Sequence, residues 1–238
     1  MKDEVRNIVT HLRDWLEAYR EMGFDPPPVP VGASSVGGGV SGKGSIQESH
    51  VAETGSLEAL SDHIGDCRRC RLHQGRNHLV FGEGAPNARL VLIGEGPGRE
   101  EDLAGRPFVG EAGKLLTRII ENGMKVKRRD VYICNVVKCR PPGNRDPEAD
   151  EVATCLPFLE RQVRLINPEV ICTLGRVAAG SLAGGEFKIT KERGKWRSWM
   201  GIAWMPTYHP AYLLRNPAAK RPVWEDVQEI MRRLDLEV

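Results

Sequence analysis

Four short apolar runs recur along this chain, and longer segments separate each run from the next. The first, RLVLIG, leads directly into a glycine-rich loop. Continuous apolar runs of this length are typical of strands that are buried on both faces of a sheet. The four predicted strands cover residues 89–94, 131–137, 170–174 and 203–207.

The segments between and after the predicted strands show the three- and four-residue spacing of amphipathic helices. In the longest of them, Pro147 stands in the first turn and Asp146 is the expected N-cap. Alternating strands and helices predict a mostly parallel sheet with helices on both faces. In such folds the ligand lies beyond the carboxyl ends of the strands. The predicted helices cover residues 111–122, 147–166, 176–182 and 222–234.

The first 56 residues differ from the rest of the chain. Apolar residues from Val5 to Tyr19 recur with helical spacing, which predicts an amphipathic helix over residues 3–22. In residues 24–56, 11 of 33 residues are Gly or Pro, and this composition predicts a flexible linker. We therefore expect a helical segment (1–23), a linker (24–56) and one main domain (57–238). The helix either docks on that domain or binds a partner.

The hydropathy of the sequence indicates the cellular compartment of the protein, and the distribution of charge indicates the class of its partner. No apolar run approaches the ~20 residues that span a bilayer, and the acidic N-terminus does not resemble a secretory signal. We therefore expect a cytoplasmic protein without membrane contact. Lys and Arg total 34 against 32 for Asp and Glu, but residues 188–221 hold eight basic residues and one acidic residue, Glu192. This imbalance indicates a polyanionic partner, although a solvated loop would show the same pattern.

The six cysteines are too few for a disulfide scaffold, and their grouping suggests a metal site. Cys67 and Cys70 form a C-x2-C pair, while Cys139 and Cys155 stand singly. Four thiolates in this order can hold a zinc ion or a four-iron cluster. The two single ligands favour the larger cluster. The two remaining cysteines lie inside apolar runs and are interpreted as core thiols.

The glycine loop alone identifies no ligand. Arg99 stands where a dinucleotide fingerprint needs its third glycine, and the loop has no G-K-[ST]. Three longer segments are more specific: GEGPGREEDLAGRPFVGEAGKLL, NVVKCRPPGNR and TYHPAYLLRNP. Together with the order of the cysteines, they resemble the family 4 uracil-DNA glycosylases, the iron–sulfur class of that superfamily. The resemblance covers roughly residues 57–234.

This resemblance implies a fold, a cofactor and a reaction. The fold is a three-layer α/β/α sandwich with a four-stranded, largely parallel sheet. The cofactor is a [4Fe-4S] cluster held by Cys67, Cys70, Cys139 and Cys155. The reaction removes uracil from single- or double-stranded DNA and leaves an abasic site. We expect a monomer associated with the nucleoid, with a replication or repair partner reached through the N-terminal helix.

The resemblance also assigns the residues that hold the base, which must leave the duplex stack before it can react. Phe108 matches the aromatic residue that stacks on uracil. Asn135 matches the residue that contacts the pyrimidine edge, since an amide can accept from N3–H and donate to O4. Glu101 matches the residue that crowds C5, although Glu100, Glu101 and Asp102 could equally form a solvated acidic turn. Gly94 and its neighbouring glycines let the backbone approach the ligand closely.

Bond cleavage places negative charge on the departing base. His209, in the TYHPAYLL segment, is expected to donate to uracil O2, and the backbone amides of Glu95 and Gly96 are expected to add to this stabilisation. Gly96 matches a position that holds a water-activating side chain in other branches of the superfamily. Any water activation in this chain must therefore come from elsewhere.

DNA contacts are expected next to the histidine and along the basic stretch. Leu213, Leu214 and Arg215 resemble the loop that fills the gap left by the flipped base. A buried leucine pair on a short helix is the alternative interpretation. The residues expected to border the DNA groove are Lys188, Lys191, Arg193, Lys195, Trp196, Arg197 and Trp199.

Two other functions are compatible with the same residues. One is a catalytically inactive iron–sulfur protein that binds nucleic acid and is linked to replication. The other is a structural domain stabilised by zinc. Phe108, Asn135 and His209 are all present, and this favours an active glycosylase.

Overall fold

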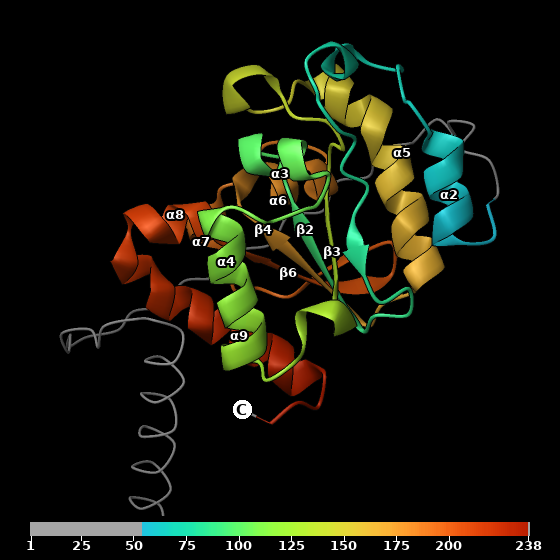
Figure 1. Cartoon of the computed structure of the whole chain (residues 1–238). Coiled ribbons are helices and arrows are strands. Elements are labelled where there is room, and N and C mark those ends of the chain that lie inside the picture. The colour runs from blue at the N-terminus through green and yellow to red at the C-terminus, as the bar shows by residue number, and fades with distance from the viewer. Residues whose placement is uncertain (1–53, 238) are drawn as a thin grey trace, which may run out of the picture.

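A computed structural model describes residues 54–237 of the chain, and its centre is a six-stranded sheet (Figure 1). The strands stand in the order β1-β3-β2-β4-β6-β5. The four central strands, β3, β2, β4 and β6, run parallel, and each edge strand is antiparallel to its neighbour. The strands are β1 (Glu83–Gly84), β2 (Leu90–Gly94), β3 (Tyr132–Asn135), β4 (Val170–Leu174), β5 (Arg197–Trp199) and β6 (Ile202–Thr207).

The predicted four-stranded sheet is therefore correct for the parallel centre and wrong in its total. The two strands that the prediction missed are short: β1 has two residues and β5 has three. Both are only partly buried, so neither carries the apolar run by which a strand is recognised. The prediction of an α/β sandwich with a mostly parallel sheet is confirmed.

Side chains of the central strand divide between two hydrophobic cores, one on each face of the sheet. In β2, Leu90 and Leu92 join one core, and Val91 and Ile93 join the other. Successive residues of a strand point to opposite faces, so an all-apolar strand needs a cover on both sides. Helices α4 (Glu111–Arg118), α8 (Pro210–Arg215) and α9 (Lys220–Arg233) supply the first core, and α5 (Ala149–Ile166) and α6 (Arg176–Ala183) supply the second. Figure 1 shows α4 and α9 on one side of the sheet and α5 on the other, with α2 (Leu57–Ile64) beside α5.

Eight α-helices fall within the described residues, and the four whose bounds were predicted lie close to those bounds. Helix α9 begins two residues earlier than predicted, and helix α4 continues into a π-helical turn over Ile119–Gly123. The helices are α2 (Leu57–Ile64), α3 (Arg99–Ala104), α4 (Glu111–Arg118), α5 (Ala149–Ile166), α6 (Arg176–Ala183), α7 (Ile189–Glu192), α8 (Pro210–Arg215) and α9 (Lys220–Arg233).

The predicted start of α5 is wrong by two residues. Its N-cap is Glu148, which forms a capping box with Glu151, and Pro147 lies outside the helix. Asp146 was the expected cap because a short polar side chain before a proline commonly takes that role. Its carboxylate instead pairs with the Arg176 guanidinium at the start of α6. Asp146 therefore joins two segments at the carboxyl end of the sheet.

The direction in which successive strands are added to the sheet reverses at β2. From β2 it passes to β3 on one side, and from β3 it crosses to β4 on the other side. A crevice forms at the carboxyl ends of the strands where such a reversal occurs. Gly94 and Asn135 are paired at this end of β2 and β3. The fold therefore places the glycine loop and Asn135 side by side, as the sequence predicts.

The helix predicted over residues 3–22 and most of the linker predicted over residues 24–56 lie outside the described part of the chain. Within residues 54–237, no helix has the length and apolar character needed to cross a bilayer.

Candidate active site

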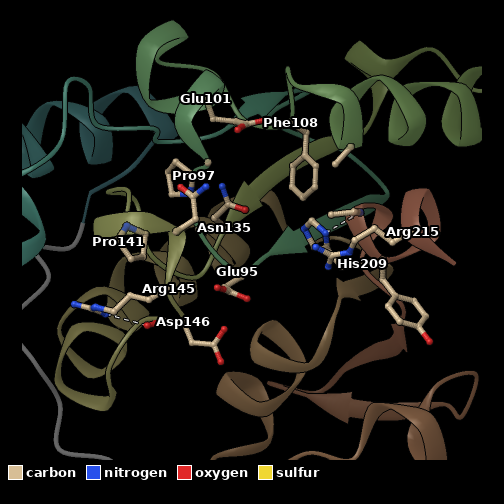
Figure 2. A pocket seen from close by; sticks show the side chains of 16 residues that line it. Glu95, Pro97, Glu101, Phe108, Asn135, Pro141, Arg145, Asp146, His209 and Arg215 are labelled. Carbon is tan, nitrogen blue, oxygen red and sulfur yellow. Dashed lines mark hydrogen bonds between the residues drawn. The ribbon is translucent and has the colours of Figure 1, made fainter.

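A cavity of about 440 Å³ opens at the carboxyl end of the parallel strands. It is lined by the glycine loop after β2, by the end of β3 and by the segment that follows β6. Figure 2 shows Glu95, Phe108, Asn135 and His209 turned toward a common space. The predicted site residues that line this cavity are Glu95, Gly96, Glu101, Phe108, Asn135, His209 and Arg215.

Asn135 is the last residue of β3, and only 2% of its surface is exposed. Its Oδ1 atom is buried and has no hydrogen-bond partner in the structure. Buried polar atoms are almost always paired, so an unpaired acceptor in a cavity wall points to a ligand donor. The Asn135 side chain is therefore prepared to accept a hydrogen bond from a molecule in the cavity.

Phe108 forms an aromatic wall and is held in an unusual backbone conformation. Its φ angle is 50°, a left-handed value that is rare for a bulky residue. The backbone can take this course because Gly113 of α4 lies directly against it: a Cβ at Gly113 would lie 2.0 Å from the Phe108 carbonyl. The Phe108 ring lies 5.5 Å from the His209 ring, centroid to centroid. Strain of this kind is concentrated at functional sites.

Glu101 lies on α3 and is partly buried. Its Oε1 atom accepts hydrogen bonds from Val109 N at 3.0 Å and from Gly110 N at 3.1 Å. The interpretation of residues 100–102 as a solvated acidic turn is therefore wrong for Glu101. It is also wrong for Asp102, which is fully buried.

His209 is the N-cap of α8, and its Nδ1 atom accepts a hydrogen bond of 3.1 Å from Ala211 N. With Nδ1 as the acceptor, the proton of the neutral ring is on Nε2. Burial lowers the pKa of His209 to about 4, and the nearby Glu101 carboxylate opposes this shift. The imidazole is therefore neutral at physiological pH and has one N–H to donate.

Glu95 contributes a feature that the sequence analysis did not predict. Only its backbone amide was expected to act, but its carboxyl group also faces the cavity (Figure 2). Burial raises the pKa of Glu95 to about 7, the Asp146 carboxylate adds to the rise, and Arg176 opposes it. A carboxyl group with a pKa near neutrality is suited to take up a proton. The sequence signal that could have indicated this role is the position of Glu95 directly after a buried strand.

The cavity wall includes other residues that the sequence analysis did not single out. All but Asp146 lie in the three motif segments, so their neighbourhood was predicted but their roles were not; Asp146, which was predicted only as an N-cap, directly follows the second segment. They are Pro97, Gly98, Ala112, Pro141, Asn144, Arg145, Asp146, Ala211 and Tyr212.

The three residues predicted to intercalate into DNA take different positions on α8. Leu213 has no exposed surface and belongs to the core, so its assignment to DNA contact is wrong. Leu214 is 44% exposed, and Arg215 lines the cavity. The helix therefore turns one leucine inward and leaves the next one free for contact.

The basic stretch is also less available than its composition suggests. The Arg193 guanidinium is bound to Asp226, and both Lys195 and Arg197 pair with Glu192. Lys188 and Lys191 are exposed.

The two tryptophans of this stretch pack on the protein. Trp196 lies against the first core and stacks with the Arg233 guanidinium at 4.7 Å, and Trp199 packs against the second core. Arg193 and both tryptophans are therefore only partly exposed, and their contact with DNA stays a prediction.

The four predicted ligand cysteines form a separate cluster. Burial raises the pKa of the Cys139 thiol, and the nearby Cys70 and Cys67 add to this rise. Burial likewise raises the pKa of Cys155 to about 12, with Cys139 and Cys70 among the further causes. The four thiols are therefore neighbours, although residues 54–237 contain no group of three or more His, Cys, Asp or Glu side chains arranged to hold a metal ion.

The surroundings of these thiols suit a bound metal cluster. Arg69 donates to Cys67 Sγ at 3.3 Å, Arg76 to Cys139 Sγ at 3.1 Å, and Lys138 N to Cys155 Sγ at 3.3 Å. Hydrogen bonds from N–H groups stabilise metal-bound sulfur and tune iron–sulfur clusters. These N–H donors, together with the positive charges of Arg69 and Arg76, are therefore suited to stabilise four thiolates that bind one metal cluster.

Comparison with known proteins agrees with this architecture. A family model of the uracil DNA glycosylase superfamily matches residues 81–228, more than half of the chain. The chain therefore belongs to the uracil-DNA glycosylase superfamily.

Within that superfamily, several relatives are Type-4 uracil-DNA glycosylases. The chain is 48% identical over 178 residues to the Type-4 uracil-DNA glycosylase of Thermotoga maritima, covering 73% of this chain and 92% of the relative. It is 47% identical over 183 residues to that of Sulfurisphaera tokodaii, covering 74% and 83%. A Type-5 uracil-DNA glycosylase of Pyrobaculum aerophilum is 29% identical over 62% of this chain and 71% of its own.

Proposed function

We propose that this protein removes uracil from DNA by hydrolysing the bond between uracil N1 and the sugar C1′. The observation that supports this most strongly is the buried, unpaired Oδ1 of Asn135 in the cavity wall, beside Phe108 and His209. These residues provide one acceptor, one aromatic face and one neutral N–H donor. A flipped uracil needs all three.

Base selection follows from the edge that Asn135 presents. Its Oδ1 accepts from uracil N3–H, and its Nδ2 donates to O4. Cytosine has no N3–H and carries an amino group in place of O4, so it would face two mismatched contacts. Phe108 stacks on the ring, and Glu101 stands where the C5 methyl group of thymine would extend. The site therefore favours uracil over both normal pyrimidines.

Catalysis in this proposal uses two side chains that line the cavity, His209 and Glu95. As the N1–C1′ bond breaks, its electron pair moves to the base, and the Nε2–H of His209 stabilises the charge on O2. A water molecule bonds to C1′, and the Glu95 carboxylate takes up the proton that the water releases. This assigns to Glu95 the water activation that Gly96 cannot provide.

DNA contact in this proposal rests on α8 and on the exposed lysines. Leu214 fills the space vacated by the flipped base, and Arg215, Lys188 and Lys191 contact phosphates. The exposed position of Leu214 supports this role.

We infer that Cys67, Cys70, Cys139 and Cys155 hold a [4Fe-4S] cluster. When bound, such a cluster cross-links the segment before β1, the segment after β3 and helix α5. Its role here is structural, because all four thiols lie outside the residues that line the cavity.

Residues 57–238 form the catalytic domain in this proposal, which acts as a monomer at the nucleoid. The amphipathic sequence pattern of residues 3–22 supports contact with a replication or repair partner.

The direct test uses an oligonucleotide that contains one uracil. Incubation with the purified protein, followed by alkaline cleavage of abasic sites, should cut the strand at the uracil. An oligonucleotide with thymine at the same position should stay intact. Asn135→Ala should lose uracil excision while retaining its affinity for the thymine strand. Uncut uracil DNA with the wild-type protein would contradict the proposed function.

A further inference from the structure

We propose that Asn77 and Asp102 form a positioning pair that sets the geometry of the uracil pocket from outside it. The inference rests on the proposed function, because it assigns to this pair the placement of Phe108 and Glu101. Neither Asn77 nor Asp102 lines the cavity. The pair acts through helix α3, which lies between the segment at residues 76–78 and the pocket.

Asp102 has no exposed surface, and a buried carboxylate is costly unless donors surround it. Its Oδ1 accepts from Asn77 N at 2.8 Å and from His78 N at 3.3 Å, and its Oδ2 accepts from Asn77 Nδ2 at 2.6 Å. The Asp102 carbonyl also lies 2.9 Å from His78 Nδ1. These contacts fasten α3 to the segment at residues 76–78.

The next residue on α3 extends this connection to the pocket. Glu101 binds the backbone N–H groups of Val109 and Gly110, which directly follow Phe108. These two hydrogen bonds hold the chain where Phe108 takes its left-handed conformation. A displacement of α3 would therefore move Phe108 and Glu101 together.

The other end of the connection is also fixed. Arg76, whose side chain is 7% exposed, donates to Cys67 O at 2.6 Å and to Cys139 Sγ at 3.1 Å. It also pairs with Asp66 at 2.6 Å. Asn77 therefore follows a residue that is anchored to the cysteine cluster, and this anchoring gives α3 a stable support.

The pair can be tested by reversing it. In the Asn77→Asp variant, two carboxylates meet and a donor to Asp102 is lost. Adding Asp102→Asn restores the pairing with the roles exchanged, because the new amide can donate to position 77 while still accepting from both backbone N–H groups. Asn87→Asp, an exposed change of the same chemistry at another position, is the matched control.

The readouts separate the base pocket from the rest of the protein. They are the inhibition constant of free uracil, the affinity for an undamaged oligonucleotide and the melting temperature. Losing a hydrogen bond to a charged group should raise the uracil inhibition constant about tenfold or more in Asn77→Asp. The affinity for undamaged DNA should not change. The reversed pair should return the uracil constant to within about threefold of the wild-type value, and Asn87→Asp should match the wild type.

Two results would overturn the positioning role. One is an unchanged uracil constant in Asn77→Asp, and the other is a parallel loss of uracil binding and DNA affinity that the reversed pair does not restore. The wild-type protein tests the proposed function separately: if free uracil does not inhibit it and uracil DNA stays uncut, the proposed function fails whatever the variants do.

Discussion

Gly94 and Asn135 lie opposite each other at the ends of neighbouring parallel strands, and a Cβ on Gly94 would lie 2.3 Å from Asn135 Oδ1. The same Cβ would lie 2.6 Å from the Phe108 ring. Such contacts are shorter than real Cβ atoms allow. Any side chain at position 94 must therefore displace both residues that are proposed to hold the base.

Gly94→Ala should therefore slow uracil excision by about 10²-fold, because a misplacement of roughly 1 Å at a reacting centre has an effect of that size. Single-turnover rates on a uracil oligonucleotide measure this change. Gly185→Ala is the matched control, since a Cβ there meets no atom within 4 Å. An active Gly94→Ala enzyme would show that Asn135 and Phe108 do not need their observed positions.

His209→Ala should lower the single-turnover rate by about 10²- to 10³-fold, the usual effect of losing one oxyanion donor. Affinity for undamaged DNA should stay near the wild-type value. Because the pKa of His209 is lowered to about 4, the ring is neutral from pH 5.5 to pH 8, and the fold-loss should be constant over that range. A loss that appears only at the acid end would indicate that a charged imidazole is needed.

Glu95 should give the wild-type rate a dependence on pH near neutrality. Its pKa is raised to about 7, so the carboxylate form that takes up a proton is lost as the pH falls below that value. The single-turnover rate should therefore fall between pH 8 and pH 6. In Glu95→Gln the rate should be low and independent of pH over this interval. A wild-type profile that stays flat would remove the carboxylate from the reaction.

The raised pKa of Glu95 also affects the stability of the fold. Stability should fall as the pH rises, whereas the reaction rate should increase. A carboxyl group whose pKa is raised by folding stabilises the protein fully below its unfolded value of about 4.5, and this contribution disappears as the pH rises through about 7. Glu95→Gln should therefore raise the melting temperature more at pH 8 than at pH 5. Equal melting shifts at both pH values would contradict this expectation.

The two leucines of α8 offer a matched pair. Leu213→Ala should destabilise the fold by about 2–5 kcal/mol, because it empties a fully buried position. Leu214→Ala should leave the unfolding free energy nearly unchanged and slow excision from double-stranded DNA more than from single-stranded DNA. Denaturant unfolding and excision assays on both substrates separate these outcomes. Equal effects of the two variants on stability would contradict the assigned orientations.

The cysteine cluster should be visible in the metal content. The purified protein should be brown and hold about four irons per chain, and Cys139→Ser should lose the iron and melt at a lower temperature. Since Arg76 joins Cys139 to the Asn77 segment, iron loss should also weaken inhibition by free uracil. Stoichiometric zinc in place of iron would contradict this prediction.

The sequence predicted the parts of the fold that depend on local patterns. Each central strand was recognisable because burial on both faces of the sheet requires an apolar run. The pocket residues were recognisable because they lie in three motif segments at the ends of these strands. The edge strand Arg197–Trp199 has no such run. The burial of Leu213 and the exposure of Leu214 depend on how the six-residue helix α8 is rotated against the core. The raised pKa of Glu95 depends first on its burial and then on Asp146 and Arg176, which are distant in sequence.

The two edge strands also protect the molecule from self-association. A sheet edge with free N–H and C=O groups can recruit a strand of another chain. Here each edge of the parallel centre is covered by an antiparallel strand of only two or three residues, and Glu83 and Arg197 place charges on those strands. Short, charged edges are poor templates for a further strand. The apolar strand pairs that build the binding crevice can therefore lie at the centre of the sheet without making the folded protein prone to aggregate.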